Sequence, residues 1–179
     1  MNSMSRGYYD PCGKEKKREE EKCPTILKCG CPSTVQLPVV TTGTTNITIA
    51  SLNLDTSCLC DPVVRISFSG AFTSTVSIVT GGISLQVYKQ CKNQLTPTPV
   101  GPSWPVVGLV STALALPGPV YPSFTICDND SCFDECCTYT VVATISGVVG
   151  ATAGAAFNNS SLNAIVTCQN SCNKCRRDK

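Results

Sequence analysis

The sequence has no histidine and is poor in charged and aromatic side chains. Of its 179 residues, 15% are charged and 6% are aromatic. Without histidine, the usual Ser-His and Cys-His nucleophile pairs cannot form. We therefore expect a protein that is not an enzyme, with no catalytic residues and no cofactor.

Long apolar segments are also missing. No stretch approaches the roughly 18 uninterrupted apolar residues that indicate a membrane-spanning helix. The beginning of the chain, MNSMSRGYYDPCGKEKK, lacks the apolar core of a Sec-type signal peptide. We expect no membrane partner and synthesis without a Sec signal peptide.

Charge is distributed unevenly along the chain. Residues 1–31 hold seven basic and five acidic residues, whereas residues 32–173 hold only three basic and six acidic ones. No basic face is evident, so no nucleic-acid partner is expected. A body this poor in charge is weakly protected against association, which suits a protein that packs against copies of itself.

From Ser33 onward the composition turns to Val, Ile and Thr, broken by Gly and Pro, without convincing helical periodicity. Alternation of apolar and polar residues predicts strands with one apolar face. The strands are expected near residues 33–40, 44–54, 62–69, 74–80, 83–91, 104–111, 120–127, 137–147 and 160–168. The residues expected in the core are Val64, Ile66, Phe68, Leu85, Val87, Val141 and Ile145.

This pattern predicts an all-β fold, an antiparallel two-sheet sandwich. Short strands with loops of uneven length favour a jelly roll, with an immunoglobulin-like sandwich as the alternative. The domain should span residues 32–168, between an extended cysteine-bearing N-terminal arm (1–31) and a cysteine-bearing C-terminal tail (169–179).

Several local signals refine this interpretation. Gly81-Gly82 reads as a hairpin turn, and residues 96–102 read as a proline-rich loop. Residues 157–161 read as a break in the chain. Trp104 and Tyr121 are expected to be packing residues.

Cysteine is abundant, with 14 residues. A domain near 150 residues buries enough surface to fold without disulfides, so the cysteines indicate cross-linking, metal binding or redox chemistry. Cys91, Cys127 and Cys168 each close a predicted strand, where a cysteine can also act as a small buried apolar residue. Cysteines in the arms and loops have no such explanation.

Zinc binding is the main alternative use of these thiols. Cys172-x-x-Cys175 has half the spacing of a zinc knuckle, and Cys132-x-x-x-Cys136 offers another pair. However, no second C-x-x-C motif supplies the remaining ligands, so we assign no metal-binding residue. The acidic segment 128–135 begins like a calcium loop but lacks the required Gly and Glu, and it reads as a solvated loop.

Four sequence strings carry a family resemblance: SCLCDPVVRISFS, ISLQVYKQCKNQ, PVGPSW and FTICDNDSCFDECCTYTVVATISG. Together they resemble a family of uncharacterised cysteine-rich proteins from spore-forming clostridia, over about residues 29–168. The layout is similar to that of the subunits of bacillal endospore appendages, which are jelly-roll proteins. In those fibres, a cysteine-bearing N-terminal arm forms disulfides with preceding subunits.

The resemblance implies a structural subunit that self-assembles into a disulfide-cross-linked fibre, an endospore appendage. The expected partners are copies of itself and other spore-surface proteins, and the expected location is the spore surface or an extracellular fibre. Three explanations reconcile the abundant cysteine with the missing signal peptide: the thiols bind metal, they stay reduced, or the protein leaves by a route other than secretion, such as lysis of the mother cell. The alternative is a cysteine-rich spore coat or metal-sequestering protein. The candidates for intermolecular disulfides are Cys12, Cys23, Cys29, Cys31, Cys91, Cys127, Cys132, Cys136, Cys137, Cys168, Cys172 and Cys175.

Overall fold

The computed structural model describes residues 25–38, 43–56, 59, 62–74, 78–92, 94–110, 118–129, 136–149 and 154–168, and these residues contain strands but no helix. Along the chain the strands are β1 (Ile26–Cys29), β2 (Ser33–Gln36), β3 (Thr44–Asp55), β4 (Pro62–Ser74), β5 (Ile78–Cys91), β6 (Thr98–Val110), β7 (Ser123–Asp128), β8 (Cys136–Val149) and β9 (Ala155–Cys168). Within these ranges, no helix is long and apolar enough to cross a membrane.

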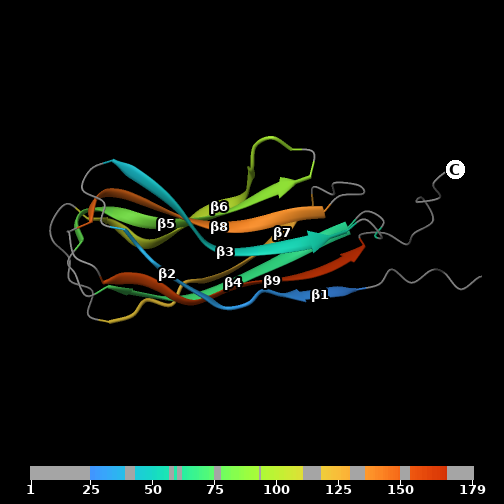
Figure 1. The fold of residues 1–179 in the computed structure, drawn as a ribbon, viewed down its shortest axis with the longest axis horizontal. Coiled ribbons are helices and arrows are strands. Elements are labelled where there is room, and N and C mark those ends of the chain that lie inside the picture. Colours follow the sequence, from blue (N-terminus) through green and yellow to red (C-terminus); the bar gives the residue numbers. More distant parts are fainter. Residues whose placement is uncertain are drawn as a thin grey trace, which may run out of the picture.

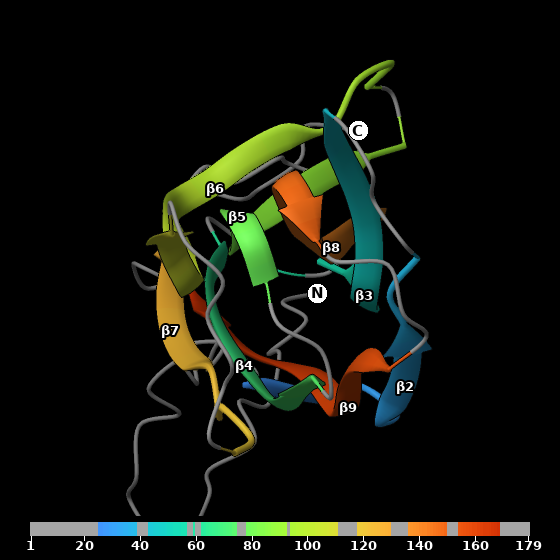
Figure 2. The same ribbon diagram turned by 90° about the vertical axis from the view of Figure 1, so that its left-hand side faces the viewer.

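The strands form two antiparallel sheets that pack face to face (Figure 1). One sheet has the order β1–β9–β4–β7, with β2 also paired to β9, and the other has the order β3–β8–β5–β6. Seen from one end, β6 lies beside β7 and β3 beside β2, so the sheets approach each other along both sides (Figure 2). The orders β2–β9–β4–β7 and β3–β8–β5–β6 are those of an eight-stranded jelly roll. The predicted fold class is confirmed.

The core follows directly from the alternating pattern. Along β4, Val64, Ile66 and Phe68 point inward and are at most 3% exposed, while Arg65 between them is exposed. Successive side chains of a strand point to opposite faces, so each strand contributes every second residue to the space between the sheets. All seven residues predicted to be core are buried.

Aromatic side chains fill one part of this interior. Phe68 stacks on Phe124, with ring centroids 5.1 Å apart, and Trp104 also stacks on Phe124, with ring centroids 3.9 Å apart. The prediction that Trp104 is a packing residue is therefore confirmed. The same prediction for Tyr121 is wrong, because Tyr121 is 71% exposed.

The predicted turn at Gly81-Gly82 is wrong. Both glycines lie inside the single strand β5, and they pair with Gly147 and Ser146 of β8. A hairpin turn requires that its two flanking segments pair with each other. Here the residues on both sides of the glycines pair with β8 instead, so the chain continues without reversing.

Two other irregular segments are also strands. Residues 98–102 begin β6, where Gly101 takes a φ of 70°, a left-handed conformation that suits glycine. Residues 157–161 lie in β9, which bulges opposite Gly70 and contains Asn159 at a φ of 51°. Asparagine is one of the few residues that tolerate this conformation, so the chain bends there without ending the strand.

The inner part of the expected arm lies on the sandwich. Residues 26–29 form β1, which pairs with β9 from Ile26↔Val166 to Cys29↔Asn163. The backbone N–H of Gly30 then donates to the carbonyl of Leu162 at 3.0 Å. This strand escaped prediction because four residues are too few to show a clear alternation. Residues 1–24 and the tail 169–179 lie outside the described residues.

Replacing Phe68 with Ala should lower the free energy of unfolding by about 3–5 kcal/mol, because the change leaves a cavity beside Phe124. Urea denaturation followed by the fluorescence of Trp104, the single tryptophan, measures this loss. The matched control is Leu95→Ala, since Leu95 is 97% exposed and its loss should cost below about 0.5 kcal/mol. Equal effects of the two changes would contradict this packing.

Candidate functional site at the cysteine-rich end of the sandwich

Most of the described cysteines gather at one end of the sandwich. At this end, which we call the cysteine-rich end, β3, β5, β7 and β9 finish and β4, β6 and β8 begin. The antiparallel register sets Cys91 opposite Cys137, Cys136 opposite Asp55 and Cys168 opposite Pro62. Strand β1 also starts here, opposite Val166, so the chain enters and leaves the described domain at the same end.

Two of the candidate cysteines are bonded to each other. Cys91 of β5 and Cys137 of β8 form a disulfide across neighbouring strands, with Cα atoms 4.0 Å apart, and both are buried. Their assignment as intermolecular candidates is corrected, because the ladder places the two thiols face to face within one chain. Cys168, partly buried at the end of β9, is disulfide-bonded as well.

Four of the described cysteines are free and exposed: Cys29, Cys31, Cys127 and Cys136. Cys127 lies one residue before the end of β7, which closes at Asp128, and it is not a small buried apolar residue. It lies on the outer face of β7, opposite Arg65. These four thiols are accessible to an oxidant or to a thiol of another molecule. The other candidates Cys12, Cys23, Cys132, Cys172 and Cys175 lie outside the described residues.

The Cys29-Gly30-Cys31 segment is held firmly on the edge of its sheet. The N–H of Gly30 donates to the Leu162 carbonyl, and the Oδ1 of Asn163 lies 3.2 Å from the same nitrogen. A Cβ at Gly30 would collide with the Leu162 carbonyl, so only glycine permits this close approach. The two exposed thiols are therefore presented from a fixed backbone.

Cys136 has a distinct electrostatic environment. Partial desolvation raises the pKa of its thiol, the Asp55 carboxylate raises it further by charge and by a hydrogen bond, and Lys92 acts in the opposite direction. The thiolate is the reactive form of cysteine, so a raised pKa slows oxidation at neutral pH. The Cys136 thiol is thus exposed to solvent, but it oxidises slowly at neutral pH.

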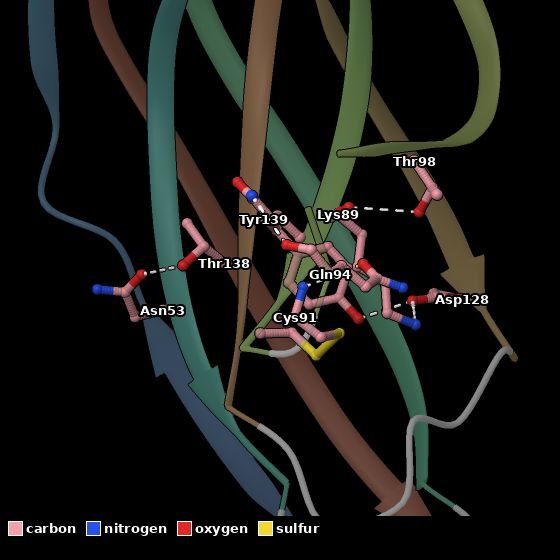
Figure 3. The surroundings of a disulfide bond; sticks show 10 residues. Asn53, Lys89, Cys91, Gln94, Thr98, Asp128, Thr138 and Tyr139 are labelled. Atoms are coloured by element: carbon pink, nitrogen blue, oxygen red, sulfur yellow. Dashed lines mark hydrogen bonds and ion pairs between the residues drawn. A yellow bond between two sulfur atoms is a disulfide. The ribbon is translucent and has the colours of Figure 1, made fainter. Parts of the chain in front are cut away.

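A buried polar cluster lies two residues from the disulfide on both strands. Lys89 Nζ lies 2.9 Å from Asp128 Oδ2, and the Tyr139 hydroxyl donates to the same oxygen at 2.7 Å (Figure 3). Lys89 of β5 and Tyr139 of β8 are cross-strand partners, whereas Asp128 comes from β7 in the other sheet. The cluster therefore joins the two sheets.

Sequence reasoning missed this cluster. It read Asp128 as part of a solvated acidic loop, but Asp128 is only 6% exposed. A signal was present, because Lys89 continues the inward phase of Ile83, Leu85 and Val87. A lysine in an inward phase requires an acidic partner, since a buried charge without one is very costly.

A groove of about 590 Å³ opens beside the cluster, with Lys89, Asp128 and Cys127 among its lining residues. Gln94 and Thr98 line the same groove, so it is polar on one side. The described part of the chain holds no group of three His, Cys, Asp or Glu residues placed to bind a metal ion.

Replacing both Cys91 and Cys137 with Ala should lower the free energy of unfolding by about 2–4 kcal/mol, the usual contribution of a native disulfide. The bond joins residues 46 apart in sequence, so its loss enlarges the unfolded ensemble. Urea denaturation of the variant and of the reduced wild-type protein measures the effect. Equal stability of the variant and the oxidised protein would show that the bond does not form.

Solved structures share the fold of this chain. The structure of infectious bursal disease virus, Gt strain, matches with a TM-score of 0.50 and 14% identity, over 92% of this chain and 38% of that chain. The VP2 subviral particle of infectious bursal disease virus matches with a TM-score of 0.48 and 14% identity, over 94% and 39%. The chain thus spans less than two fifths of these proteins, and the likeness concerns the fold alone.

Sequence comparison with curated proteins gives no match. A family model, by contrast, matches residues 23–167, which include all nine strands except the last residue of β9. The match also covers the disulfide, the buried cluster and the four exposed thiols. The chain belongs to the family described as Domain of unknown function (DUF4489).

Proposed function

We propose that this protein is a structural subunit that assembles with copies of itself into a disulfide-cross-linked fibre, an endospore appendage. The observation that carries the proposal is the division among its described cysteines. Cys91, Cys137 and Cys168 are in disulfides, whereas Cys29, Cys31, Cys127 and Cys136 are free and exposed. A subunit that is linked covalently to its neighbours needs free, exposed thiols on a domain that is already stable.

The free thiols lie on separate surfaces of the sandwich. Cys29 and Cys31 lie along the β1 edge, Cys127 lies on the outer face of β7, and Cys136 begins β8. A chain with thiols on several surfaces can bond to more than one neighbour, which a fibre requires. Disulfides between subunits make separation a matter of bond breaking, so such a fibre is kinetically stable.

The sheet edges also support self-assembly. Strand β6 carries Pro99, Pro102 and Pro105 and pairs irregularly with β5, features that block further pairing. Strand β3 is twelve residues long and contains no proline, lysine or arginine. Its outer edge pairs with no other described strand, so β3 is the edge that suits strand addition by another copy.

The proposed location follows from the chemistry of the thiols. Disulfides between subunits persist in an oxidising environment, so the fibre belongs outside the cell, on the spore surface. There it would contact other spore-surface proteins. The role is structural, and we assign no catalytic residue.

Replacing Cys12, Cys23, Cys29 and Cys31 together with Ser should abolish the covalent link between subunits. The variant should keep the sandwich fold, because neither Cys29 nor Cys31, the two of these cysteines that the structure describes, is part of the core. On electrophoresis in denaturant without reductant, wild-type protein should give a ladder of multimers, and the variant should run as a monomer.

The matched control for this experiment is Cys172→Ser with Cys175→Ser, which should keep the ladder. A ladder in the four-site variant, lost only in the control, would show that the C-terminal cysteines make the link. Protein that holds metal and shows no ladder would favour the metal-sequestering alternative.

Ser51→Lys should prevent assembly under reducing conditions, because a lysine on an edge strand opposes further pairing. Ser51 is an exposed residue in the middle of β3, so the charge does not disturb the core. Size-exclusion chromatography with reductant should show a monomer in place of the wild-type assembly.

Ser103→Lys gives the corresponding charge on β6, at another exposed position. This control should assemble like the wild-type protein. If Ser51→Lys assembles as well as Ser103→Lys does, strand addition at β3 is wrong.

A further inference from the structure

The Lys89–Asp128–Tyr139 cluster contains an ion pair, and its amine and carboxyl groups are also chemical groups that can react with each other. The side chains of Lys89 and Asp128 are only 5% and 6% exposed. The amine nitrogen of Lys89 and the carboxyl oxygen of Asp128 lie 2.9 Å apart, and the Tyr139 hydroxyl donates to that same oxygen (Figure 3). An amine and a carboxyl group held at this distance have the components of an amide bond.

Along the strand ladders, the neighbours of the cluster are apolar. On the β5–β8 ladder, the inward pairs next to Lys89 and Tyr139 are Val87 with Val141 and the Cys91–Cys137 disulfide. Asp128 lies opposite Val64, which is 3% exposed. In a medium of low dielectric constant, two separate charges are costly. Transfer of one proton from the ammonium to the carboxylate gives a neutral amine and a carboxylic acid, which are the reactive forms.

We propose that Lys89 and Asp128 condense to form an isopeptide bond. The lone pair of Lys89 Nζ attacks Cγ of Asp128, and a bond forms between the nitrogen and this carbon. The bond from Cγ to one carboxyl oxygen then breaks, and that oxygen leaves as water with the proton that the nitrogen gives up. The ion pair becomes a neutral secondary amide plus one water molecule, with no oxidant, reductant or activating group consumed.

Tyr139 is the positioning residue for this reaction. Its hydroxyl hydrogen-bonds to Asp128 Oδ2, where negative charge develops when the nitrogen attacks. A donor already placed at that oxygen stabilises the tetrahedral intermediate without reorganisation. The disulfide beside it holds β5 and β8 in register, which keeps the amine and the hydroxyl on the same carboxyl group. Reacting groups held in this way gain a large effective concentration.

The groove beside the cluster provides an exit for the water that is released. Lys89 and Asp128 line it together with Gln94, Thr98 and Cys127. The resulting bond would connect β5 in one sheet to β7 in the other, whereas the Cys91–Cys137 disulfide connects two strands of the same sheet. The two layers of the sandwich would then be joined by a link that no reductant breaks.

Mass spectrometry of the full-length wild-type protein, after complete reduction and unfolding, tests this proposal. The intact mass should be lower than the sequence mass by one water molecule. Trypsin should fail to cut after Lys89, and the peptide containing Lys89 should be recovered covalently joined to the peptide containing Asp128. A wild-type mass equal to the sequence mass would overturn the proposal, whatever the variants do.

Lys89→Arg is the matched control, because a guanidinium keeps the ion pair but does not form the amide. This variant should show the full sequence mass, and a loss of water that persists in it would place the reaction elsewhere and contradict the proposal. Tyr139→Phe tests the positioning role. Shortly after cell-free synthesis, its cross-linked fraction should be several-fold below that of the wild-type protein, although the folded content measured by circular dichroism is the same. Equal fractions would remove Tyr139 from the mechanism.

Discussion

The register of β5 against β8 determines which side chains meet at the cysteine-rich end. It sets Val87 opposite Val141, Lys89 opposite Tyr139 and Cys91 opposite Cys137 on the inward face of one ladder. A shift by one residue would turn all of these side chains to the outer face. The disulfide, the polar cluster and the apolar core therefore depend on a single alignment. A shift by two residues would keep the valines inward but would separate Cys91 from Cys137 and Lys89 from Tyr139.

The sequence was sufficient for the fold class because the hydrophobic pattern is regular where strands are regular. Val64, Ile66 and Phe68 were recognisable as core, since a period of two is a direct consequence of strand geometry. The errors lie where local chemistry and tertiary pairing disagree. Gly81-Gly82 has the composition of a turn, yet pairing with β8 keeps it extended. Asn159 permits a bulge in a segment that sequence reasoning took for a break in the chain.

The candidate site was less accessible to sequence reasoning. The excess of cysteine was evident, but the pairing of Cys91 with Cys137 depends on residues 46 apart that meet only in the folded ladder. Which thiols are exposed also depends on the strand register, as Cys127 shows by pointing outward from β7, opposite Arg65 of β4. The Lys89–Asp128 pair joins two sheets, and nothing in either strand alone specifies the contact.

Entry and exit of the chain at the cysteine-rich end give the subunit a direction. Strand β1 starts at Ile26 and strand β9 ends at Cys168, and both of these positions lie at that end. Repeated head-to-tail contacts between such subunits are heterologous and do not close by two-fold symmetry. A filament of this kind would have structural polarity, which means that its two tips present different surfaces. One tip is then suited to anchoring the filament and the other to adding subunits.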